Sequence, residues 1–89
     1  MNASVNKLAD RFSETAIDDE IVVMNLESGD FFSLTGTARA IWLLIDGARS
    51  PIELRAALAR EYGIGEDDIA ADVDTFLAEL GSAGLISAG

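Results

Sequence analysis

Carboxylates are the side chains whose spacing comes nearest to a chemical site in this sequence. Acidic residues lie adjacent or nearly so three times, as Asp18-Asp19, Asp67-Asp68, and Asp72 with Asp74. Paired carboxylates can carry out acid–base chemistry or bind a hard cation. However, Asp67 and Asp68 stand at the expected start of a helix, and Asp72 and Asp74 would point about 200° apart on it. We therefore expect a solvated acidic face rather than a catalytic or metal site.

Two residue types that often carry enzyme chemistry are missing, because the 89-residue chain has no histidine and no cysteine. This excludes disulfides, thiol chemistry, zinc sites of the Cys/His kind and histidine acid–base catalysis. Serine and threonine hydroxyls therefore have no histidine base to activate them. Thr35-Gly36-Thr37 is not a phosphate-binding loop, since the Gly-Lys-Thr of such loops is absent. We expect no enzymatic activity, no cofactor and no metal.

The charge balance argues against nucleic acid and membrane partners. Sixteen acidic residues face six basic ones, which gives a net charge of −10, whereas phosphate-rich partners require cations. A recognition helix over residues 66–80 would carry acidic residues but no lysine or arginine. No apolar run is long enough to span a membrane, and residues 1–8 lack the apolar core of a signal peptide. We expect a cytoplasmic protein.

Three strands are predicted in the first part of the chain. Residues 20–27 form the clearest one, because their apolar side chains are almost continuous. Ser28-Gly29 predicts a hairpin turn into a second strand over residues 31–34, Phe-Phe-Ser-Leu. An edge strand is expected within residues 11–16, before the turn signal Asp18-Asp19. Residues 1–7 are expected to be a frayed start.

Three helices are predicted to follow. The first has Thr35 or Thr37 as its N-cap and Gly47 as its left-handed C-cap. The second, residues 50–62, begins with the capping box Ser50-Pro51-Ile52-Glu53 and ends at Gly63. The third covers residues 66–80 and is stopped by residues 81–84, after which residues 85–86 form a short extended piece. Its apolar stripe comprises Ile69, Val73, Phe76, Leu77 and Leu80.

The β-β-β-α-α-α order predicts a single α+β domain over residues 1–89. We expect a three-stranded antiparallel sheet followed by three helices, in a winged-helix-like arrangement. Trp42 is the only tryptophan of the chain, and it stands on the first helix directly after the aromatic strand. We expect this large side chain to fix how the helices and the sheet meet.

The strand over residues 31–34 also offers a binding hypothesis. It follows a hairpin, so it has a partner on one side only, and it lacks the lysine or proline that usually protects a sheet edge. One interpretation is that the third helix covers this edge and that Phe32 and Leu34 belong to the core. The other is that a peptide adds there as a further strand, beside an apolar helical wall. Asp72 or Glu79 at the rim would then receive a cation of the peptide.

The sequence also resembles a known family, the PqqD-like peptide-recognition elements of ribosomally made, modified peptides. The resemblance covers residues 20–86 and rests on the ordered set Gly29-Asp30-Phe31-Phe32-Ser33-Leu34, Thr37-Ala38 with Ile41-Trp42, Asp46-Gly47, Ser50 to Glu53 with Leu54 and Leu58, Glu61-Tyr62-Gly63, Asp72-Val73 with Phe76-Leu77, and Gly84-Leu85-Ile86. The Asn-x-Thr-Ala that follows the third strand in the family is Thr35-Gly36-Thr37-Ala38 here.

The resemblance implies a winged-helix-like, non-catalytic protein that binds the leader segment of a precursor peptide as an added strand. It implies delivery of that leader to a peptidase or another modifying enzyme, and we favour a lasso-type pathway. Carried onto this sequence, the peptide-binding residues are Asp30, Phe31, Phe32, Ser33, Leu34, Ile69, Asp72, Val73 and Phe76. Two alternatives remain, a winged-helix regulatory module and a module that dimerises through the same edge. We expect a monomer or a weak dimer.

Overall fold

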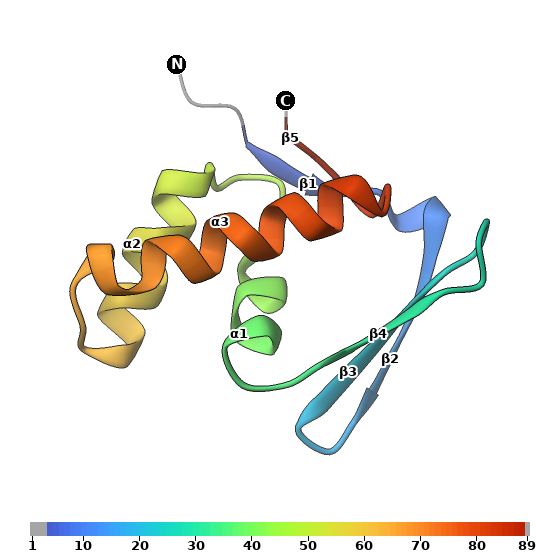
Figure 1. The fold of residues 1–89 in the computed structure, drawn as a ribbon, viewed down its shortest axis with the longest axis horizontal. Coiled ribbons are helices and arrows are strands. Elements are labelled where there is room, and N and C mark those ends of the chain that lie inside the picture. Colours follow the sequence, from blue (N-terminus) through green and yellow to red (C-terminus); the bar gives the residue numbers. More distant parts are fainter. Residues whose placement is uncertain (1–3, 89) are drawn as a thin grey trace.

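Two antiparallel sheets and three helices make up the computed structural model, which describes residues 4–88 (Figure 1). A short 3-10 turn, Ala9–Arg11, lies between the first two strands. The strands are β1 (Val5–Lys7), β2 (Phe12–Ile17), β3 (Glu20–Asn25), β4 (Phe31–Leu34) and β5 (Ile86–Ala88). The helices are α1 (Gly36–Leu44), α2 (Pro51–Tyr62) and α3 (Glu66–Ser82). The α+β class and the three-stranded antiparallel sheet with three helices are confirmed.

The larger sheet has the strand order β2-β3-β4, with each neighbouring pair antiparallel. The two-residue turn Asp18-Asp19 joins β2 to β3, and Asp18 adopts a left-handed φ of 52° as such turns require. The β3–β4 loop is organised by Asn25, whose side-chain oxygen accepts the backbone N–H groups of Glu27 and Ser28. Both hairpins occur where the sequence predicted them.

The second sheet pairs the two ends of the described chain, and the sequence analysis missed half of it. β1 pairs with β5 in the register Val5↔Ala88, Asn6↔Ser87 and Lys7↔Ile86. The frayed start expected over residues 1–7 is therefore wrong for β1, while residues 1–3 lie outside the described residues. The error has a physical cause, because a three-residue strand that pairs with the far end of the chain has no local periodicity.

Gly47 serves this second sheet rather than capping a helix. Helix α1 ends at Leu44, its C-cap is Ile45 in an extended conformation, and Gly47 follows with a φ of 83°. The Gly47 N–H donates to the carbonyl of Val5, and a Cβ at this position would lie 2.7 Å from Oδ1 of Asn6. The expected helix cap at Gly47 is thus wrong, since the glycine permits close approach of β1.

The helix termini test four further predictions. The capping box of α2 is confirmed, because the Ser50 hydroxyl accepts the Glu53 N–H and the Glu53 carboxylate accepts the Ser50 N–H. Gly63 ends α2 in the left-handed conformation, as predicted. Thr35 is the N-cap of α1 but makes no side-chain capping bond, and α3 ends at Ser82, within the segment 81–84 that was predicted to stop it.

The core forms around Trp42, whose side chain is fully buried. Its ring meets Phe12 of β2 edge to face, with centroids 5.2 Å apart, and the ammonium of Lys7 lies 4.3 Å from its centroid. Burial lowers the pKa of Lys7, against the opposing effect of the Glu14 carboxylate. Trp42 therefore joins α1 to β1 and β2, as expected for a residue that fixes how helices and sheet meet.

Candidate functional site: a groove between β4 and α3

The outer edge of β4 carries backbone groups that no other strand of residues 4–88 pairs. The Asn25 N–H donates to the Asp30 carbonyl, so this pair is hydrogen-bonded across β3 and β4. Hydrogen-bonded and non-hydrogen-bonded pairs alternate in an antiparallel ladder, so Phe32 and Leu34 also bond inward to β3. The N–H and C=O groups of Phe31 and Ser33 therefore point away from β3, toward the free edge.

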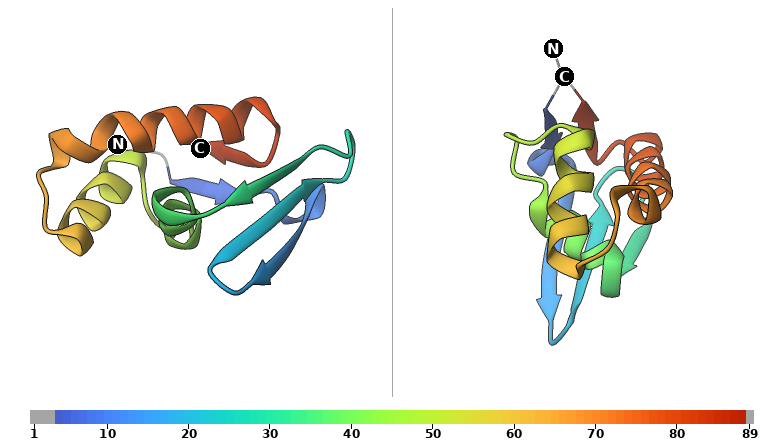
Figure 2. Two further views of the ribbon diagram at one scale, coloured as in Figure 1. Left: turned by 60° about the horizontal axis from the view of Figure 1, so that its bottom comes forward. Right: turned by 90° about the vertical axis from the view of Figure 1, so that its left-hand side faces the viewer.

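Helix α3 lies on the β4 side of the sheet (Figure 2). Residues of β4 and α3 together line a groove. Its volume is about 640 Å³. The lining residues are Phe32 from β4, Thr75, Ala78, Glu79 and Ser82 from α3, and Ala83 directly after that helix. Small side chains on α3 leave space opposite the Phe32 ring, so the groove has the width to hold side chains of a guest.

A second hollow extends this groove toward α1. It has a volume of about 250 Å³, and its lining residues are Thr37, Ala38 and Ile41 from α1 with Ala71, Asp72, Thr75, Phe76 and Glu79 from α3. Thr75 and Glu79 line both spaces. The two hollows therefore lie next to each other along α3, and we call them together the β4–α3 groove.

The α3 wall is held in place at its C-terminal end and near its middle. At the C-terminal end, the side-chain amide of Asn25 donates to the carbonyl of Ala83 at 2.7 Å, which ties α3 to the β3–β4 hairpin. Toward the middle of the helix, Val73 and Ile41 belong to the buried core, and Phe76 packs against it. The groove is therefore a preformed feature of the fold, which lowers the cost of binding.

The rim of the groove is acidic. Asp72 and Glu79 are both exposed and line it. The nearby Asp74 instead accepts hydrogen bonds from Nε and Nη2 of Arg55 on α2, at 3.0 and 2.6 Å. Within residues 4–88, no group of three or more acidic side chains lies close enough to hold a metal ion. The geometry suits a guest that bonds through its backbone and places apolar or basic side chains in the groove.

The predicted site residues fall into three groups. Phe32, Asp72 and Phe76 line the groove. Three others are exposed along the edge or just before it, namely Asp30, Phe31 and Ser33. The remaining three have buried side chains in the core, namely Leu34, Ile69 and Val73. The structure therefore brings the predicted strand and helix together, while the role of these residues in binding stays a prediction.

Sequence reasoning missed the small residues on the helical wall, although it expected Asp72, Phe76 and Glu79 there. Thr75, Ala78 and Ser82 recur at the three- and four-residue spacing of one helix face. That face lies on the side of α3 away from the apolar stripe, so the periodicity of the large apolar residues does not point to it. Small, weakly apolar residues do not stand out in a search for large side chains, and this is why the face was overlooked.

An open antiparallel sheet edge beside a helical wall defines a class of proteins that bind a peptide by strand addition. The chain belongs to the PqqD family, since the family model described as coenzyme PQQ synthesis protein D matches residues 20–86. It is also similar to a solved structure described as TbiB1 in complex with the TbiA(beta) leader peptide. The two share 30% sequence identity over 91% of this chain and 94% of that chain, with a TM-score of 0.79. None of the curated proteins matches this chain.

The length and composition of the helices show whether any of them could span a membrane. Among the described residues, no helix has both the length and the apolar character needed to cross a bilayer. The longest, α3, contains acidic residues throughout its length.

Proposed function

We propose that this protein binds the leader segment of a ribosomally made precursor peptide as an added strand on β4. The observation that carries the proposal is the free ladder of Phe31 and Ser33 beside the preformed groove. A solved structure similar to this chain is described as a complex with a leader peptide, which supports the same kind of guest here. Backbone hydrogen bonds would supply affinity without reading sequence, as in other cases of strand addition.

Specificity would come from the side chains of the guest strand. Alternate residues of a strand point to opposite faces, so every second guest residue would face α3. An apolar side chain fits the space between Phe32 and Ala78, and a basic one nearby would meet Asp72 or Glu79. The net charge of −10 favours a leader with basic residues through long-range attraction.

In this proposal the protein presents the bound leader to a peptidase or another modifying enzyme and catalyses nothing itself. The absence of histidine and cysteine from the sequence supports a binding role. We also propose a cytoplasmic location, because ribosomal precursors are made there. The preference for a lasso-type pathway, the monomeric or weakly dimeric state, the single domain over residues 1–89 and the winged-helix likeness stay predictions.

The direct test is to titrate the protein with the leader of a precursor encoded beside its gene. Calorimetry measures the binding, and backbone amide shifts locate it. We expect saturable binding, with shifts concentrated in residues 30–34 and along α3 from Asp72 to Ala83. Amide shifts are the better probe because Trp42 is fully buried and senses the groove only indirectly. Unchanged signals in residues 30–34 would refute strand addition.

A substitution that fills the groove sharpens this test. Ala78 is exposed on α3 and lines the groove, so Ala78→Trp should weaken leader binding by about tenfold or more. Its free energy of unfolding should change by about 0.5 kcal/mol or less, as is usual for exposed positions. Glu66→Trp, at the exposed first turn of the same helix, is the matched control and should bind normally.

A further inference from the structure

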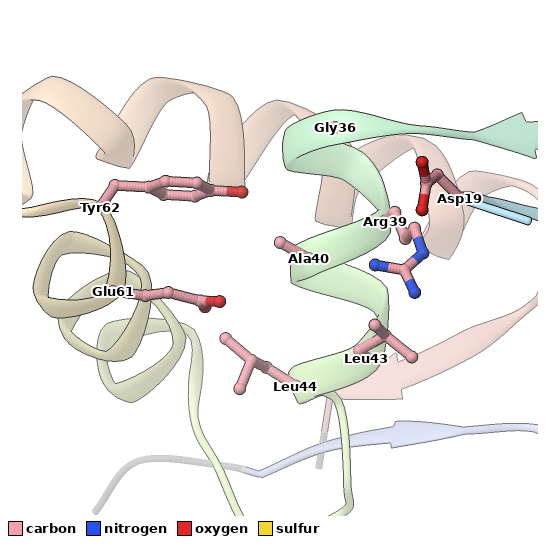
Figure 3. Close-up of a pocket in the computed structure, with 8 residues that line it drawn as sticks. All are labelled: Asp19, Gly36, Arg39, Ala40, Leu43, Leu44, Glu61 and Tyr62. Atoms are coloured by element: carbon pink, nitrogen blue, oxygen red, sulfur yellow. The ribbon is translucent and has the colours of Figure 1, made fainter.

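A separate hollow lies on the other side of α1, where this helix faces α2 and the β2–β3 turn (Figure 3). Its volume is about 380 Å³. The lining residues are Asp19 from the turn, Gly36, Arg39, Ala40, Leu43 and Leu44 from α1, and Glu61 and Tyr62 from α2. We call this space the α1–α2 hollow.

The α1–α2 hollow and the β4–α3 groove share no lining residue. On α1, the groove is lined by Thr37, Ala38 and Ile41, whereas the hollow is lined by Gly36, Arg39, Ala40, Leu43 and Leu44. At about 100° per residue, the mean directions of the two sets differ by roughly 140°. A peptide strand in the groove would therefore leave the hollow free for a second partner.

The side chains of Glu61 and Tyr62 extend from α2 toward Ala40 and Leu44 on α1 (Figure 3). Glu61 is exposed, and within residues 4–88 the ion pairs are those of Arg49 with Asp46 and of Arg55 with Asp74. The Glu61 carboxylate is thus not engaged in an ion pair. An aromatic ring, a carboxylate and an aliphatic floor together match the stem and the charged head of a basic side chain.

Two more charged groups face the hollow. Arg39 and Asp19 lie beside each other on the flank of α1 away from Glu61 (Figure 3). Nε of Arg39 is buried and has no hydrogen-bond partner, so this guanidinium is already partly enclosed by the protein. With one cation and two carboxylates, the hollow has a local excess of one negative charge. The whole chain reinforces that sign, with a net charge of −10.

We propose that the α1–α2 hollow docks a protein segment that presents a lysine or arginine next to an apolar side chain. The basic head pairs with Glu61 over the Tyr62 ring, and the apolar side chain contacts Leu43 and Leu44. Leu43 is 51% exposed and Tyr62 45% exposed, so the docked segment covers apolar surface that water now contacts. The segment belongs to a partner other than the guest of the groove, and the proposal stands whether or not that guest is a leader peptide.

The test uses three blocked tripeptides, acetyl-Leu-Arg-Leu-amide and its versions with citrulline or glutamate in the middle position. Each is titrated into the ¹⁵N-labelled protein. We expect the arginine peptide to cause saturable shifts of Leu43, Leu44, Glu61 and Tyr62, while Ala78 in the groove does not respond. The citrulline peptide, which keeps the shape and loses the charge, should bind several-fold more weakly, and the glutamate peptide should not bind.

Variants separate the local carboxylate from the charge of the whole chain. Glu61→Gln should weaken the arginine peptide by roughly two- to fivefold, the effect of one exposed ion pair. Glu27→Gln makes the same change in net charge on the distant β3–β4 loop, and it should have no effect. Both positions are exposed, so neither variant should disturb the fold. Glu61→Lys should reverse the preference toward the glutamate peptide.

Three outcomes would overturn the proposal. The first is the absence of saturable shifts at the hollow with all three peptides. The second is equal binding of the arginine and citrulline peptides, which would mean that the carboxylate is not read. The third is preferential binding of the glutamate peptide by the unmodified protein, which would assign the recognition to Arg39 instead. Leader binding at the groove is measured separately, so its failure is distinguishable from each of these.

Discussion

The larger sheet has two outer edges in the described chain, and they differ in what lies beside them. β2 and β4 each pair only with the central strand β3. After Phe12, every residue of β2 is exposed, and its side chains include Glu14. β4 has the buried Leu34 and the half-buried Phe32, and the groove along α3 is lined by Phe32 and by no residue of β2.

The comparison indicates that an unpaired backbone ladder is not sufficient for a binding site. Both edges offer free N–H and C=O groups, so a guest strand could form similar hydrogen bonds on either. Only β4 has a wall that can enclose the side chains of that guest, and the charged Glu14 on β2 discourages pairing there. Binding at β4 therefore depends on α3 as much as on the strand itself.

Proline substitutions on the two edges provide the strongest test of this difference. The Leu26 N–H donates to the Arg11 carbonyl, so by alternation the Ala16 N–H of β2 points outward, as the Ser33 N–H of β4 does. Ser33→Pro and Ala16→Pro thus each remove one outward donor while leaving the bonds to β3. Ser33→Pro should weaken leader binding by about ten- to a hundredfold, because the ladder loses a donor and the ring obstructs the guest.

Ala16→Pro should leave the leader affinity within about twofold of the unmodified value, a difference of about 0.4 kcal/mol by the usual conversion. Calorimetric titration measures both affinities, and chemical denaturation checks that the two variants lose similar stability. A loss of binding by Ala16→Pro as large as that of Ser33→Pro would mean that the edges do not differ in the way described.

A subtler substitution tests whether the wall must be held in place. Asn25→Asp keeps the side-chain oxygen that accepts the N–H groups of Glu27 and Ser28, but it removes the donor to the Ala83 carbonyl. We expect a cost of about 1–2 kcal/mol in the free energy of unfolding. Leader binding should weaken by roughly threefold at a temperature where the variant is fully folded, because the C-terminal end of α3 is then free to move.

Denaturation and calorimetry together measure these two effects. An unchanged affinity in a destabilised Asn25→Asp protein would show that the hydrogen bond to Ala83 stabilises the fold without shaping the groove. A larger loss of affinity would indicate that the groove collapses or widens when the bond is absent. Amide exchange at Ala83 reports directly on motion at this end of the helix.

The smallest expected effect concerns α2, which contributes to neither edge. The backbone N–H of Ser50, and then its side chain, lower the pKa of the Glu53 carboxyl below its ordinary value of 4.5. A carboxyl with a lowered pKa in the folded state stabilises the protein above the unfolded pKa. That stability is lost as the pH falls through the folded pKa, so the loss from Glu53 occurs below pH 4.5.

Glu53→Gln isolates this contribution, since glutamine can complete a capping box but does not titrate. The variant should show a shallower loss of stability with acid than the unmodified protein, as measured by chemical denaturation across this pH range. Its leader affinity at neutral pH should be unchanged, because α2 lines neither hollow of the groove. Identical acid profiles for the two proteins would contradict the assignment to Glu53.

Much of the fold was predictable because its signals are local. The capping box at Ser50, the left-handed Gly63 and the apolar stripe of α3 each depend on residues a few positions apart. The pairing of β1 with β5 depends instead on residues about eighty positions apart, so no window of the sequence contains it. Gly47 was misassigned for the same reason, since its neighbour Asn6 is distant in the chain.

The site was predictable in outline and not in detail. The aromatic strand and the acidic rim could be located, since Phe32, Asp72 and Glu79 all line the groove. Large apolar residues such as Ile69 and Val73 were expected on its wall, yet their side chains are in the core. A groove is formed where side chains are small, so residues such as Ala78 define it by leaving space, and composition gives little sign of this.

The pairing of Val5 with Ala88 has a practical consequence for protein engineering. A polypeptide that enters at one of these residues and leaves at the other does so at neighbouring points of the structure (Figure 1). Domains with adjacent ends tolerate insertion into a loop of a host protein and circular permutation. Residues 5–88 could therefore be inserted into a loop of a host protein with little distortion of that loop.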